Sequence, residues 1–82
     1  MQSAPSGRDR IREEAERILR AAAAPMHNAE LANEILPALH LLDQYDAKDV
    51  NTCLHDDPLS RFLRVGKGLW TVKKGTRTLN PG

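Results

Sequence analysis

Four polar side chains near the middle of the chain recur at helical spacing. They stand at positions i, i+3, i+4 and i+7, so that a helix would bring all of them to one face: Lys48, Asn51, Thr52 and His55. Lysine and asparagine are residue types that bond guanine and adenine in the major groove of DNA. The spacing therefore suits a helix that reads base edges. The alternative is the polar outer face that any half-buried helix requires.

The C-terminal third of the chain is basic. From Arg61 to Arg77 it contains six bases and no acid. Contacts between such bases and DNA phosphates position a protein without reading sequence. If four to six bases made such contacts, binding would weaken with salt at a log–log slope of about −4 to −5. The alternative is an edge strand protected by lysines. The candidate phosphate contacts are Arg64, Lys67, Lys73 and Lys74.

The segment before this basic region is acidic. Residues 43–57 contain five acids and one base. Four of the acids lie on the helix that would carry the polar face or at its ends: Asp46, Asp49, Asp56 and Asp57. Carboxylates repel DNA phosphates but suit a basic protein partner. Two functions therefore stay open, a module that binds double-stranded DNA and a non-enzymatic adaptor that binds a protein through these acids.

Three helices are expected to position these groups. The first is predicted over residues 8–23, where apolar residues recur at helical spacing. The second is predicted to begin with Asn28 as its N-cap and to end or kink at Pro37. The third is predicted to begin with Asp46 as its N-cap, and a second aspartate at its third helical position strengthens that prediction.

A β-hairpin is expected after the helices. Residues 61–65 and 69–72 are rich in strand formers, and the Gly-Lys-Gly segment between them is typical of a hairpin turn. A bulge near this turn would exchange the two faces. Four residues of the hairpin are expected to cover the helical core: Phe62, Val65, Trp70 and Val72.

The order of these elements predicts a mainly α domain with a C-terminal hairpin, an α+β winged helix-turn-helix of three helices plus wing. Eighty-two residues suffice for one small domain. We expect this domain over residues 8–74, between a flexible leader (1–7) and a flexible tail (75–82).

Several classes of function are disfavoured by composition. The single cysteine, Cys53, allows no internal disulfide, and the scattered histidines have no zinc-site spacing. The chain has no apparent catalytic constellation, so we expect no enzyme activity, metal or cofactor. It also has no apolar run near the ~18 residues of a membrane span. We expect a cytoplasmic protein, in the nucleoid of a bacterium or in the nucleus of a eukaryote.

Three segments of the chain resemble one family. They are Glu14-Ala15 with Ile18-Leu19, the Pro-Met-His-Asn-Ala-Glu-Leu-Ala run at 25–32, and the Arg-Phe-Leu-Arg-Val-Gly-Lys-Gly-Leu-Trp run at 61–70. Together they resemble the HARE-HTH family, whose winged helix-turn-helix domains occur in Asx-like chromatin proteins, restriction-endonuclease fusions and the RNA polymerase delta subunit. The resemblance implies DNA binding or protein docking, in transcription regulation or other DNA transactions. It implies no enzyme activity.

Overall fold

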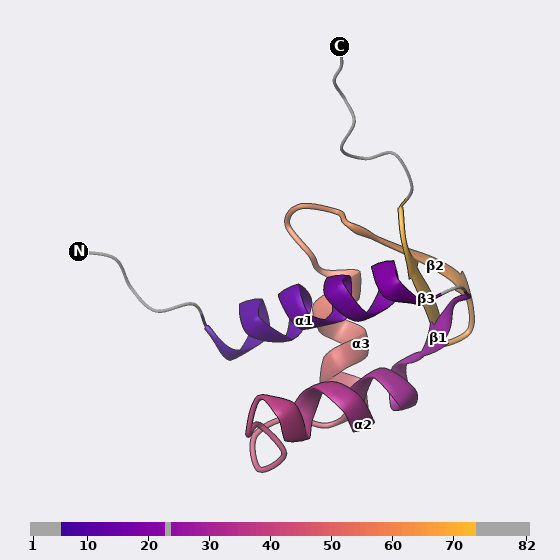
Figure 1. Ribbon diagram of the computed structural model, residues 1–82. Coiled ribbons are helices and arrows are strands. Elements are labelled where there is room, and N and C mark those ends of the chain that lie inside the picture. Colours follow the sequence, from indigo (N-terminus) through magenta and orange to yellow (C-terminus); the bar gives the residue numbers. More distant parts are fainter. Residues whose placement is uncertain (1–5, 23, 74–82) are drawn as a thin grey trace.

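The computed structural model describes residues 6–22 and 24–73. They form three helices and a three-stranded antiparallel sheet, so the expected α+β class is confirmed. The helices pack against one another, and the sheet lies at one end of them (Figure 1). In chain order the elements are α1 (Gly7–Ala21), β1 (Met26–His27), α2 (Asn28–Ala38), α3 (Ala47–His55), β2 (Phe62–Gly66) and β3 (Leu69–Val72).

Helix α1 begins and ends slightly earlier than expected. Ser6 is its N-cap, because its hydroxyl accepts a hydrogen bond from the Asp9 N–H at 3.1 Å. The two residues predicted to close the leader, Ser6 and Gly7, therefore belong to the first turn. The helix ends at Ala21 rather than at residue 23, and its inner face includes Ile11 and Leu19, both buried.

Helix α2 has His27 as its N-cap, so the prediction of Asn28 was wrong. The Ala29 N–H donates to His27 Nδ1 at 3.2 Å, and the His27 N–H donates to the Glu30 carboxylate at 3.0 Å. The cap lies one residue earlier because β1 pairs His27 with Leu69 and keeps it extended. Asn28 is thus the first helical residue.

Helix α2 ends one residue beyond Pro37, where a backbone turn at Leu39 and His40 closes it. The helix includes Pro37 and ends at Ala38. His40 then takes a left-handed conformation with φ 59°, and the Leu41 N–H donates to the Leu36 carbonyl at 2.8 Å. This reversal closes the helix and buries Leu41 in the core.

Helix α3 begins as the sequence predicts. The Asp49 N–H donates to Asp46 Oδ1 at 3.1 Å, and the Asp46 N–H donates to Asp49 Oδ2 at 3.0 Å. These reciprocal bonds satisfy two backbone donors at the start of the helix. Val50, Cys53 and Leu54 are buried on the inner face.

The sheet has the order β1-β3-β2. Phe62 pairs with Val72 and Arg64 pairs with Trp70, but the next pair joins Gly66 to Leu69, which leaves an irregularity at Val65. Phe62 and Trp70 are buried as expected, and Val72 packs against the core. The prediction for Val65 was wrong: it is 48% exposed, because side chains alternate along a strand and Val65 lies three residues after the buried Phe62, on the opposite face.

No helix within 6–22 and 24–73 combines the length and the apolar character that crossing a membrane requires.

Candidate nucleic-acid interface

An open groove lies between α3 and the β2–β3 hairpin, and we call it the α3–hairpin groove. Its walls come from three parts of the chain: the junction of β1 with α2, the outer side of α3, and the hairpin tip. The lining residues are His27, Asn28, Lys48, Asp49, Asn51, Thr52, Arg64, Lys67 and Gly68. The fold thus brings together five of the eight residues predicted to bind DNA, from segments separate in sequence.

The hairpin tip is fixed to the start of α2. The Asn28 N–H donates to the Gly68 carbonyl at 2.8 Å, and the Asn28 side chain donates to the Ala47 carbonyl at 2.8 Å. Gly68 has φ +70°, and a Cβ there would lie 2.8 Å from both Asn28 Oδ1 and His27 Nε2. A glycine is therefore required at the tip, and the hairpin, α2 and the start of α3 hold one another in place.

Asn51 links α3 to the core of the sheet. The Trp70 indole N–H donates to Asn51 Oδ1 at 2.9 Å, and Asn51 is half-buried. The bond satisfies the polar atom of a tryptophan that is only 3% exposed. Asn51 is therefore a positioning contact between α3 and β3 as well as a groove residue.

The groove has more basic than acidic side chains. Lys48 comes from α3, Arg64 from β2 and Lys67 from the turn, and among the described residues none of the three forms an ion pair with a carboxylate. Arg64 Nε donates to the Gly66 carbonyl at 3.2 Å. Asp49 is the acid that lines the groove, and one of its oxygens already accepts from the start of α3.

Arg61 lies at the hairpin base and is tied into the fold. Its guanidinium donates to both carboxylate oxygens of Asp57, at 2.9 and 3.0 Å, and to Glu16 of α1 at 3.1 Å. Burial acts to raise the pKa of Asp57, but hydrogen bonds from Arg61 and from the backbone outweigh it and lower the pKa to about 2. Arg61 thus joins the hairpin base to α1 and to the segment that follows α3.

The acidic surface is smaller than the sequence predicts. Asp57 is 6% exposed and paired with Arg61, so it does not belong to that surface. Asp46 and Asp49 cap α3, and the N–H of Asp49 lowers the pKa of the Asp46 carboxyl. Asp56 is exposed and lies 3.0 Å from His55 Nδ1. Of the four aspartates expected to face a protein partner, Asp57 is therefore not at the surface.

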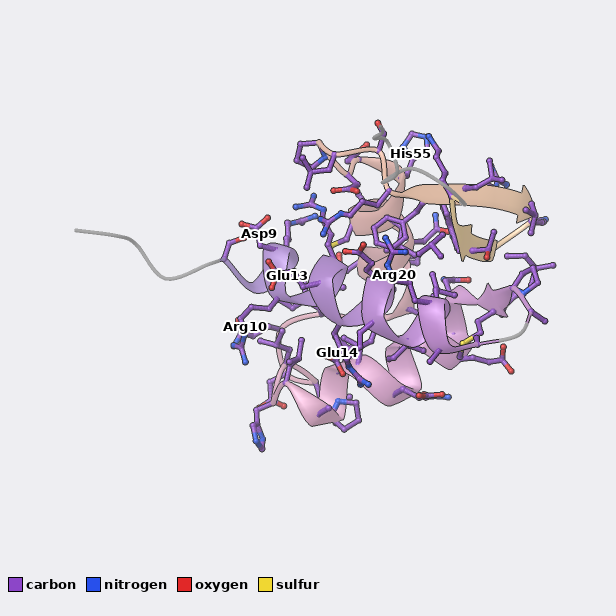
Figure 2. All side chains as sticks on the ribbon, turned by 45° about the horizontal axis from the view of Figure 1, so that its top comes forward. Asp9, Arg10, Glu13, Glu14, Arg20 and His55 are labelled. Carbon is purple, nitrogen blue, oxygen red and sulfur yellow. The ribbon has the colours of Figure 1, made fainter. Side chains whose placement is uncertain are left out.

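Two other predicted DNA contacts, His55 and Lys73, do not line the groove. His55 lies at the far end of α3, beside Asp56 (Figure 2). Lys73 follows β3 at the hairpin base, where its N–H donates to the Arg61 carbonyl at 3.0 Å. Lys74 lies outside the described residues. Thr52 does line the groove, and its hydroxyl donates to the Lys48 carbonyl at 3.1 Å.

Three groove residues were missed by sequence reasoning: His27, Asn28 and Gly68. Asn28 was expected only as the N-cap of the second helix, and Gly68 only as part of the hairpin turn. The pairing of a two-residue strand with β3 places them at the groove. The histidine before a helix start and the glycine of the turn were visible signals, but nothing in their spacing indicates that the two meet.

Metal and thiol chemistry find no support among the residues that the structure describes. Within that part of the chain, no three histidine, cysteine, aspartate or glutamate side chains cluster as a metal site would need. The Cys53 thiol is buried, and burial raises its pKa, so the reactive thiolate is disfavoured. The Cys53 carbonyl accepts a bond from Arg12 Nε at 2.9 Å, which fixes α1 against α3.

Comparisons with known proteins give no match: no family model, curated protein or solved structure is significantly similar to the chain.

Proposed function

We propose that this chain is a winged helix-turn-helix module that binds double-stranded DNA. Helices α2 and α3 correspond to the helix-turn-helix, and the β2–β3 hairpin corresponds to the wing. The order of elements and the motifs at 25–32 and 61–70 support this assignment and the relation to the HARE-HTH family. The module carries no catalytic group in the proposal and acts by binding alone.

One observation carries the proposal. Three cations, Lys48, Arg64 and Lys67, converge on one groove from α3 and the hairpin. In the proposed complex α3 approaches the major groove, and one strand of the DNA backbone passes between α3 and the hairpin. Neutralising phosphates releases counterions, so three contacts would give a log–log salt slope of about −3.

The protein-docking alternative has less support. It depends on the acids near α3, and one of the four, Asp57, is buried in an ion pair. Two others, Asp46 and Asp49, have carboxylate oxygens that cap the helix. Fewer carboxylates are thus left to face a basic partner.

Charge reversal tests the DNA proposal. We expect Lys67→Glu to weaken binding to a labelled duplex about tenfold or more at low salt, measured by fluorescence anisotropy. Arg10→Glu is the matched control, because Arg10 is an exposed arginine of α1 outside the groove (Figure 2). Equal affinities of wild type and Lys67→Glu would contradict the proposal.

A further inference from the structure

We infer that the α3–hairpin groove is a phosphate-binding site. Two oriented neutral donors, Asn51 and His27, recognise the phosphate together with the cations of the groove. The inference deepens the proposed function and rests on it for the identity of the ligand as DNA. It assigns Asn51 a different role from the adenine contact expected from the sequence.

The orientation of the Asn51 amide is fixed by Trp70. An indole N–H can only donate, so the atom that faces it at 2.9 Å must be the Asn51 oxygen. The amide nitrogen, with its two hydrogens, is then the part left to the groove that Asn51 lines. Reading adenine needs both amide atoms in one plane with the base edge. Because the oxygen is held by the core of the sheet, Asn51 is better suited to donate to an oxygen.

The orientation of His27 is fixed by the N-cap of α2. His27 Nδ1 accepts from the Ala29 N–H at 3.2 Å, so in the neutral imidazole the hydrogen is on Nε2. Nε2 lies against the hairpin tip, where a Cβ on Gly68 would be 2.8 Å away. Since His27 lines the groove, its Nε2–H is a donor at the end formed by α2 and the hairpin.

Three lining side chains also offer acceptor oxygens. One is Asn28, whose amide nitrogen donates to the Ala47 carbonyl and whose Oδ1 faces Gly68. The other two lie on α3. The Thr52 hydroxyl donates to the Lys48 carbonyl, which leaves its oxygen lone pairs, and Asp49 is a carboxylate whose Oδ2 accepts from the Asp46 N–H. An anion would therefore lie toward the hairpin, near Arg64 and Lys67, and away from Asp49. The unesterified oxygens of a DNA backbone phosphate carry no hydrogen, so they only accept and match such a set of donors. A phosphate of the DNA backbone and a free phosphate share anionic acceptor oxygens of this kind.

The sharpest test keeps the hydrogen bond from Trp70 and replaces the Asn51 donor that faces the groove with an acceptor. Asn51→Asp retains an oxygen for the indole N–H and replaces the amide donor with a carboxylate oxygen. We expect about tenfold weaker binding, equal for a duplex of A·T pairs and a duplex of G·C pairs. Asn33→Asp, on the exposed face of α2 outside the groove, adds the same charge and should leave affinity within about twofold.

A second variant tests the other donor. His27→Ser keeps an N-cap oxygen for α2 and removes the imidazole N–H from the groove. We expect about fivefold weaker binding to both duplexes, the loss of one hydrogen bond, with an unchanged circular dichroism spectrum.

Two results would contradict the phosphate-binding site. One is unchanged duplex affinity of Asn51→Asp. The other is a loss of affinity confined to the A·T duplex, which would show that Asn51 contacts a base. Inorganic phosphate separates this inference from the proposed function. We expect it to shift the Asn51 Nδ2 and His27 Nε2 NMR signals. If phosphate shifts these signals but no duplex binds, the phosphate-binding site is supported and the DNA proposal is contradicted. If duplex binds but phosphate leaves both signals unmoved, the phosphate-binding site is contradicted and the DNA proposal is supported.

Discussion

The two ends of the β2–β3 hairpin use their arginines in opposite ways. At the base, Arg61 bonds both oxygens of the buried Asp57 and reaches Glu16 of α1. At the tip, Arg64 bonds the carbonyl of Gly66 in its own strand and lines the α3–hairpin groove. The two residues are three apart in a uniformly basic segment. Whether a cation stabilises the fold or is left for a ligand thus depends on the elements that the fold places beside it.

Removing each arginine should separate the two roles most strongly. Arg61→Ala leaves the buried Asp57 carboxylate without its partner, and we expect the free energy of unfolding to fall by about 3 kcal/mol in urea denaturation. Arg64→Ala removes an exposed side chain, and we expect a change within about 0.5 kcal/mol. Equal losses would contradict the distinction between base and tip.

Lowering the pH should reduce the stability that the Arg61–Asp57 ion pair gives to the hairpin. The folded chain lowers the pKa of Asp57 from 3.8 to about 2, so the folded state binds this proton less readily than the unfolded state. The Asp57 carboxylate contributes about 2 kcal/mol to the free energy of unfolding. This contribution is complete above about pH 4 and is lost as the pH falls toward 2. We expect Asp57→Asn to flatten the decline of stability over this range, measured by urea denaturation. A decline as steep as that of the wild type would show that another group dominates.

A smaller effect should distinguish the two glycines of the tip. Gly68→Ala places a Cβ 2.8 Å from Asn28 Oδ1 and His27 Nε2, on a backbone with φ +70°. We expect the free energy of unfolding to fall by about 1–2 kcal/mol. At Gly66 the nearest atom would be the end of the flexible Leu69 side chain, at 3.1 Å. Gly66→Ala should therefore cost less, and thermal unfolding of the two variants compares them. A larger loss for Gly66→Ala would contradict the packing of the tip.

Local patterns predicted α1 and α3 well. The apolar spacing placed α1 to within two residues at each end, and the two aspartates at the start of α3 form the cap that the sequence indicates. These features depend on residues within one or two turns of each other. The interactions that determine them are therefore visible in the sequence.

The contacts that build the groove could not be predicted in the same way. The bond from Trp70 to Asn51 spans 19 residues, and that from the Asn28 N–H to Gly68 spans 40. The pairing of β1 with β3, which places His27 opposite Leu69, also joins segments that no local pattern connects. Five DNA-contact candidates meet in the groove because of these long-range contacts.

The salt dependence of duplex binding tests most directly whether the α3–hairpin groove is the DNA interface. We would compare the wild type with a triple variant, Lys48→Ala/Arg64→Ala/Lys67→Ala, by fluorescence anisotropy at several salt concentrations. We expect the log–log slope to become shallower by about 3 in the variant, one for each lost phosphate contact. An unchanged slope, with duplex still bound, would show that DNA contacts another surface and would contradict the α3–hairpin groove as the interface.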